Sequence, residues 1–138
     1  MHFEALLRRE GSWWLIEAPA LDVMTQGRTR ADACRMLAEA VELLADRQDL
    51  KVMVRAEGRG PTAILSASDP DVLIPLMLRR QRQKHGLTLA EVARRLGARS
   101  VNAVARYEQG RVRPTLAKLT ALMAAIDPAI VPVLRVAA

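Results

Sequence analysis

The sequence predicts an α+β protein in which a small β-β-β-α-β-β domain, residues 1–68, precedes an all-helical domain, residues 69–138. Short runs of β-branched and aromatic residues between turn residues fill the first half, whereas the second half has helical periodicity throughout. The charge balance changes at the same place: residues 1–70 hold nine Lys/Arg and eleven Asp/Glu, but residues 71–138 hold twelve and four. The turn-forming segment Ser-Asp-Pro-Asp at residues 68–71 marks the boundary.

The first half contains five strand-like segments and one helix. We expect the strands at residues 3–8, 13–17, 23–25, 51–56 and 62–65. Thr29 is predicted to cap the helix, with Asp32 placed three residues later as in a capping box. Apolar residues at helical spacing define its inner face: Ala33, Leu37, Ala40, Val41 and Leu44.

Four helices are predicted after the boundary. The first holds Pro75 in its first turn, because an interior proline would cost about 3 kcal/mol, and it extends to Gly86. The second begins after Thr88, with Glu91 completing a capping box, and ends at Gly97.

The third helix is expected at about residues 100–109, with Val104 and Tyr107 facing inward. The fourth follows Pro114 and ends before Pro128. Its predicted inner face comprises Leu116, Leu119, Met123 and Ile126. The tail after residue 128 fits either a short strand or a last helix.

Two short helices joined by a tight turn are typical of a helix-turn-helix, whose second helix presents its N-terminal residues to base edges in the major groove of duplex DNA. Any small helical bundle has similar spacing, but Asn102 and Arg106 face away from the inner side, which favours DNA binding. The base contacts expected are Arg99, Ser100, Asn102, Ala103 and Arg106. Phosphate contacts are expected from Arg79, Arg80, Lys84, Thr88, Arg111 and Arg113.

This half resembles the Xre/Cro-type helix-turn-helix in residues 87–93 (LTLAEVA), 107–110 (YEQG) and 113–114 with Leu116. The resemblance covers about 50 residues and implies a structural ion pair between Arg82 and Glu108. Leu89 stands where many members carry a glutamine, and the turn at residues 98–101 is one residue longer than in the shortest members.

No catalytic set is evident, so we expect no enzyme and no cofactor. The only histidines are His2 and His85, and the single cysteine, Cys34, lies on a helix. One Cys and two His cannot form a zinc site unaided, and no phosphate-binding glycine loop is present. A single thiol, no apolar run of about 20 residues and no leader-like start together predict a cytoplasmic protein that does not span a membrane.

The first half resembles the HicB antitoxin domain in residues 11–14 (GSWW), 18–21 (APAL) and 25–29 (TQGRT), followed by an Ala-rich helix. The resemblance implies a partial RNase H-like β-β-β-α-β fold without nuclease carboxylates. Residues 22–23 (DV) replace the usual Pro-Gly. The implied function is that of a type II antitoxin, which binds a small basic HicA-type ribonuclease toxin and represses its own operon as a homodimer or higher oligomer on operator DNA.

Two other functions remain open from the residues. The first is a free transcription factor whose N-terminal domain senses a ligand or only dimerises; a pocket with convergent polar groups would indicate it. The second is a nuclease on the RNase H-like scaffold, against which the lack of an inward carboxylate cluster argues.

Overall fold

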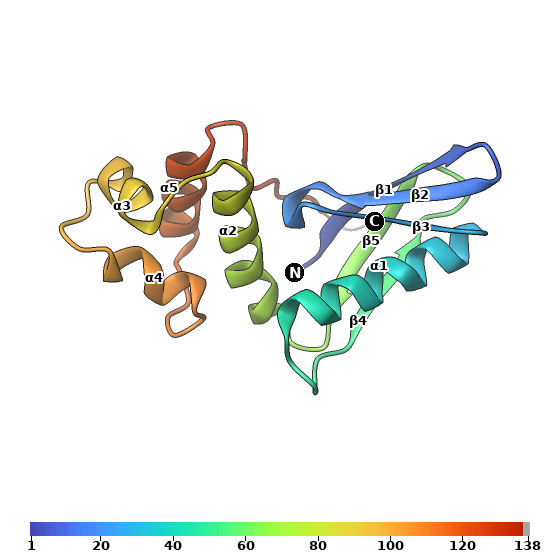
Figure 1. Ribbon diagram of the computed structural model, residues 1–138, viewed down its shortest axis with the longest axis horizontal. Coiled ribbons are helices and arrows are strands. Elements are labelled where there is room, and N and C mark those ends of the chain that lie inside the picture. The colour runs from blue at the N-terminus through green and yellow to red at the C-terminus, as the bar shows by residue number, and fades with distance from the viewer. Residues whose placement is uncertain (137–138) are drawn as a thin grey trace. The chain divides into compact units, whose positions relative to one another are not determined.

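The computed structural model describes residues 1–136 (Figure 1). The chain folds as two compact units, residues 1–77 and 78–138, and the division between them falls within helix α2 (Leu73–Lys84). Before this helix, the segment predicted as the boundary leads into a short 3-10 turn, Pro70–Val72. Pro75 lies in the first turn of α2, as predicted. None of the helices among the described residues has the length and apolar character needed to cross a membrane.

Unit 1 is a five-stranded sheet with one helix, α1 (Arg30–Ala45), against one face (Figure 1). The strands are β1 (Phe3–Glu10), β2 (Trp13–Ala18), β3 (Val23–Gly27), β4 (Val52–Ala56) and β5 (Thr62–Ala67). Their order is β3-β2-β1-β5-β4, and all neighbouring pairs are antiparallel. Helix α1 contacts both edge strands, β3 and β4. All five predicted strands and the predicted helix are therefore present.

Alternation along the strands explains the core of unit 1. In β1, Phe3, Ala5 and Leu7 are buried while the residues between them are exposed, which is the period of two expected for a sheet with one covered face. Thr29 caps helix α1 as predicted, because the Asp32 N–H donates to the Thr29 hydroxyl at 3.0 Å. The capping box is incomplete, since the Asp32 carboxylate accepts from the Arg28 N–H and not from the Thr29 N–H. Its buried residues are Ala33, Cys34, Leu37 and Val41, whereas Ala40 and Leu44 are only half-buried.

Unit 2 contains three helices besides the end of α2: α3 (Leu89–Leu96), α4 (Asn102–Glu108) and α5 (Leu116–Ile126). The capping box of α3 is complete, because Thr88 accepts from the Glu91 N–H and Glu91 accepts from the Thr88 N–H. Helix α5 begins after a Thr115 cap and ends before Asp127. The predicted second and fourth helices are confirmed.

Three details differ from the expectations. Helix α4 is shorter than residues 100–109, because the Ser100 hydroxyl and carbonyl accept from the N–H groups of Asn102 and Ala103 and hold Ser100 in the turn. Leu116 was wrongly placed in the inner face of α5: it is 56% exposed as the first helical residue, and Leu122 is buried instead. The tail forms neither strand nor helix over residues 130–136.

Candidate nucleic-acid interface

The turn between α3 and α4 is fixed by backbone geometry at Gly97. This residue has φ 75°, a left-handed conformation that costs glycine little. The N–H of Ala98 donates to the Ala93 carbonyl at 2.9 Å, and the N–H of Gly97 donates to the Arg94 carbonyl at 3.1 Å. These bonds satisfy the carbonyls at the end of α3 and set the direction in which the chain enters α4.

Helix α4 has an apolar face and a polar face. Val104, Ala105 and Tyr107 are buried, whereas Asn102 and Arg106 are exposed. The guanidinium of Arg106 lies over the Tyr107 ring, 5.2 Å from its centroid, which holds this long side chain close to the helix surface. The face that carries Asn102 and Arg106 therefore presents an amide and a guanidinium, the two groups best suited to bidentate base contacts.

The other three candidates for base contacts occupy different positions. Arg99 and Ser100 are exposed but lie in the turn, not on the helix. The Ser100 hydroxyl already accepts from the Asn102 N–H at 3.1 Å, so its O–H proton and one lone pair remain for DNA. Ala103 is half-buried on the helix and can offer no more than a methyl contact.

The residues proposed to contact phosphates border the same motif. Five of them are exposed, namely Arg79, Lys84, Thr88, Arg111 and Arg113, whereas Arg80 is half-buried. The Thr88 hydroxyl accepts from the Glu91 N–H, and its own proton can still be donated. Arg111 lies in the loop that follows α4, and its backbone N–H donates to the Arg106 carbonyl at 3.0 Å. Lys84 and Thr88 precede α3 in the chain, and Arg111 and Arg113 follow α4. The two helices of the motif are therefore flanked on both sides by groups that can bind phosphates.

A largely buried ion pair supports the position of α4. Arg82 Nε donates to Glu108 Oε1 at 2.6 Å and Arg82 Nη2 donates to Glu108 Oε2 at 3.0 Å, an arrangement that is bidentate. Arg82 Nη1 also donates to the Leu87 carbonyl at 2.9 Å. The resemblance to the Xre/Cro type implied this pair, and the structure contains it. The pair joins the end of α2 and the α2–α3 loop to the last residue of α4.

Two polar contacts at the end of α5 were not predicted. His85 Nε2 lies 2.9 Å from Asp127 Oδ2, and His85 Nδ1 lies 2.8 Å from the Gln81 carbonyl. Arg95 Nη1 donates to the Ala125 carbonyl at 3.3 Å, which partly satisfies the helix end. Only the position of His85 near a helix C-terminus was visible in the sequence, because its acidic partner is 42 residues away.

The described residues contain no cluster of three or more His, Cys, Asp or Glu side chains that could hold a metal ion. Burial raises the pKa of the Cys34 thiol. A thiol is a poor nucleophile when its pKa is raised, because the thiolate is the reactive form.

Comparison with known proteins identifies one part of the chain. Residues 76–127 match a family model described as a helix-turn-helix domain. The match begins in α2, contains α3, the turn and α4, and ends directly after α5. No curated protein matches the chain. Unit 2 thus carries a helix-turn-helix domain, and the greater part of unit 1 lies outside the match.

Proposed function

Because residues 76–127 form a helix-turn-helix domain, we propose that the chain is a DNA-binding transcriptional regulator of the Xre type. The observation that carries this proposal is the exposed polar face of α4, with Asn102 and Arg106 on a helix held by a buried ion pair. Asn102 and Arg106 read bases, with Arg99, Ser100 and Ala103 as the other base contacts. Two-fold symmetry of the operator would be matched by a homodimer or higher oligomer.

The proposal extends to the partner of unit 1. We propose that the chain is the antitoxin of a type II HicAB system, which neutralises a HicA-type mRNA-cleaving toxin by direct binding and represses its own operon. Support comes from the resemblance of residues 11–29 and the following helix to the HicB domain. The acidic excess of residues 1–70 suits a small basic toxin. In this role unit 1 binds the toxin and has no catalytic activity of its own. The partial RNase H-like fold of unit 1 is part of the same proposal.

The alternative is a free-standing Xre-type regulator whose unit 1 dimerises or senses a ligand. One observation favours it: a groove of about 550 Å³ lies between α1 and β4. Arg30 and Arg55 line it together with Cys34 and the apolar residues of β4. A hollow that offers guanidinium groups beside apolar residues is the kind of feature that a sensor of a small anion would need.

Affinity purification of the tagged full chain, expressed with its two neighbouring reading frames, separates these proposals. A stoichiometric small basic protein that is toxic when expressed alone would establish the antitoxin. The variant Asn102→Ala/Arg106→Ala should retain this partner but lose operator binding, because it changes only the DNA-facing side of α4. A homo-oligomer without a partner would reject the antitoxin and favour the ligand sensor. Failure of the wild type to bind the DNA upstream of its own gene would reject the repressor.

A further inference from the structure

The charges of unit 1 are separated in space. Within residues 1–70, six of the nine cations lie in three segments, residues 8–14, 26–30 and 55–62, which hold only two acidic residues. These segments form the tip of the β1–β2 hairpin, the β3–α1 turn and the β4–β5 turn, and Figure 1 shows them together at one end of the sheet. We call this region the arginine end and define it by Arg8, Arg9, Arg28, Arg30, Arg55 and Arg59. A domain that is slightly acidic on average thus has one strongly basic end.

The arginine end is built by contacts between the three segments. Arg30, the first residue of α1, donates to the carbonyls of Gly58 at 3.1 Å and Gly60 at 2.7 Å. Its guanidinium also lies 5.3 Å from the centroid of the Trp14 ring. The Leu7 N–H donates to the Pro61 carbonyl at 2.6 Å. The β4–β5 turn is therefore fastened to α1 and β1, and it carries Arg59 as an exposed side chain.

The arginines of this end are held mostly by rings and carbonyls. Arg28 lies over the Trp13 ring at 4.4 Å, and Arg9 Nε donates to the Gly11 carbonyl at 3.2 Å. Neither kind of partner carries a negative charge. The Asp32 carboxylate, which accepts from the Arg28 N–H at 2.9 Å, is shared with Arg35 and therefore offsets the charge of Arg28 only in part. The Arg8–Glu10 ion pair is 3.7 Å long, and both side chains are more than half exposed. Solvent therefore screens this pair, and Glu10 neutralises little of the charge of Arg8.

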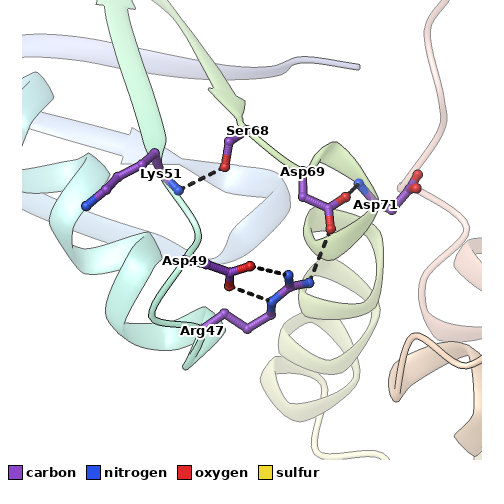
Figure 2. A network of polar contacts seen from close by, with 6 residues as sticks. All are labelled: Arg47, Asp49, Lys51, Ser68, Asp69 and Asp71. Atoms are coloured by element: carbon purple, nitrogen blue, oxygen red, sulfur yellow. Dashed lines mark hydrogen bonds and ion pairs between the residues drawn. The ribbon is translucent and has the colours of Figure 1, made fainter.

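Elsewhere in unit 1 the arginines are neutralised by carboxylates. Arg35 bonds Asp32 at 2.6 Å and Glu39 at 2.7 Å. Arg47 bonds Asp49 at 3.1 Å and Asp69 at 3.2 Å, and Figure 2 shows its guanidinium between these two carboxylates. The arginines of unit 1 thus occupy two environments. Arg35 and Arg47 are paired with carboxylates, whereas the arginines of the arginine end present positive charge to the solvent.

We propose that the arginine end is a second, sequence-independent contact to duplex DNA, made to the phosphate backbone. The inference rests on the proposed DNA-binding function, because a duplex held by the helix-turn-helix domain is tethered to unit 1 through the continuous chain of α2. A weak second contact on a tethered domain gains affinity from its high effective concentration. Planar guanidinium groups match phosphate geometry, and groups held against rings lose less freedom on binding.

Duplex DNA fits this surface better than single-stranded nucleic acid does. Binding of single strands depends on open aromatic faces on which bases stack. Trp13 and Trp14 are only partly exposed, and an arginine covers one face of each ring. The surface therefore has exposed guanidinium groups that can bind phosphates, but it has no open aromatic face on which a base could stack.

The test compares two triple variants of the full chain with the same loss of charge in the same unit. Arg9→Gln/Arg28→Gln/Arg59→Gln removes three charges from the arginine end, and Arg35→Gln/Arg47→Gln/Lys51→Gln removes three elsewhere. Each is titrated with a random duplex of about 20 base pairs, enough for two half-sites one turn apart, and with one of about 50, where flanking phosphates are available. Random single-stranded RNA of the longer length is a third probe. Tryptophan emission is read alongside anisotropy, because both tryptophans of the chain lie at the arginine end.

We expect the arginine-end variant to bind the long duplex at least about tenfold more weakly than wild type, and its salt slope to fall by about two to three. The control triple should change little, and the short duplex should be affected less than the long one. The wild type should also change its tryptophan emission on the long duplex. Equal losses for the two triples, or none, would overturn the inference while leaving the DNA-binding function intact. A loss confined to RNA would overturn it in favour of an RNA contact. Absence of duplex binding by the wild type would reject both proposals.

Discussion

Replacing Glu108 by glutamine tests the physical basis of the helix-turn-helix most directly. The side chain keeps its shape, but the charge that faces Arg82 is lost. The two side chains are only 15% (Arg82) and 7% (Glu108) exposed, so water has limited access to the guanidinium that is left behind. Glutamine can accept one of the two bonds that the carboxylate accepts at 2.6 and 3.0 Å. The variant therefore leaves a mostly buried charge without its counter-ion.

Removing one partner of a buried ion pair costs about 3–5 kcal/mol. Since both groups are less than a third exposed, solvent screening reduces this cost little. A unit of about 60 residues has a free energy of unfolding of roughly 3–9 kcal/mol by the usual value per residue. We therefore expect Glu108→Gln to consume at least a third of the stability of unit 2, and in the limit to unfold it at room temperature.

The assay is urea unfolding followed by two probes. Far-UV circular dichroism reports the helices of both units, whereas tryptophan fluorescence reports unit 1 alone, because Trp13 and Trp14 are the only tryptophans. The transition of unit 2 should move to lower urea while the fluorescence transition stays in place. Glu39→Gln is the matched control: it breaks a pair with Arg35 whose side chains are 53% and 60% exposed, and should cost less than about 1 kcal/mol.

A loss for Glu108→Gln no larger than for the control would refute this reasoning. A second variant separates burial from pairing. Arg82→Met/Glu108→Leu removes both charges and leaves apolar side chains of similar size, which is often close to neutral. It should therefore recover much of the stability that the single variant loses. If the double variant is the less stable of the two, the pair stabilises the unit through its hydrogen bonds and not through charge balance.

Four further outcomes are expected. Asn102→Ala should weaken operator binding by about 1–3 kcal/mol and relax preference at one base pair; equal weakening on random DNA in anisotropy titrations would contradict base reading. Arg113→Ala should weaken binding to all duplexes alike and lower the salt slope by about one. The Ala129 N–H and the adjacent imidazole lower the pKa of Asp127 from 3.8. The Asp127 carboxylate thus contributes fully to the free energy of unfolding above about pH 4, and this contribution is lost as the pH falls through the lowered pKa of the folded state. The urea midpoint of Asp127→Asn should therefore depend less on pH in that window than the midpoint of the wild type. A Cβ at Gly27 would lie on the backbone of the first turn of α1, so Gly27→Ala should lower the fluorescence-detected stability of unit 1, whereas Gly60→Ala, whose Cβ would make only an ordinary van der Waals contact, should not.

The elements that could be predicted are those whose signals are local. Short runs of β-branched and aromatic residues between turn residues predicted the strands, and the Thr29 and Thr88 caps predicted where two helices begin, because each signal depends only on residues close together in the chain. The limits of α4 could not be predicted in the same way. The Ser100 hydroxyl competes for the N–H of Asn102, and that choice depends on how Gly97 directs the turn. Arg99 and Ser100 therefore lie in the turn and not on the helix.

Pairings between distant segments gave no sequence signal. The strand order places β5 beside β1, although most of the unit separates the two strands in the chain. Leu116, at the start of α5, is exposed, whereas Leu122 in the middle of the helix is buried. Helical periodicity alone does not show which of these residues other helices cover. The contact between Arg30 and Trp14 joins residues 16 positions apart, and neither residue alone predicts it. Such contacts are set by tertiary packing, which overrides helical and strand periodicity.

The separation of charge in unit 1 determines which partners its two oppositely charged regions attract. A net charge of −2 for residues 1–70 is consistent with a surface of mixed sign, yet the arginine end and the remainder of the unit carry opposite charges. A basic toxin would be attracted to the remainder and repelled by the arginine end, whereas DNA would be attracted only to the arginine end. If both proposals hold, unit 1 can engage toxin and DNA at the same time. The arginine-end variant should then lose affinity for long duplexes while keeping its affinity for the toxin.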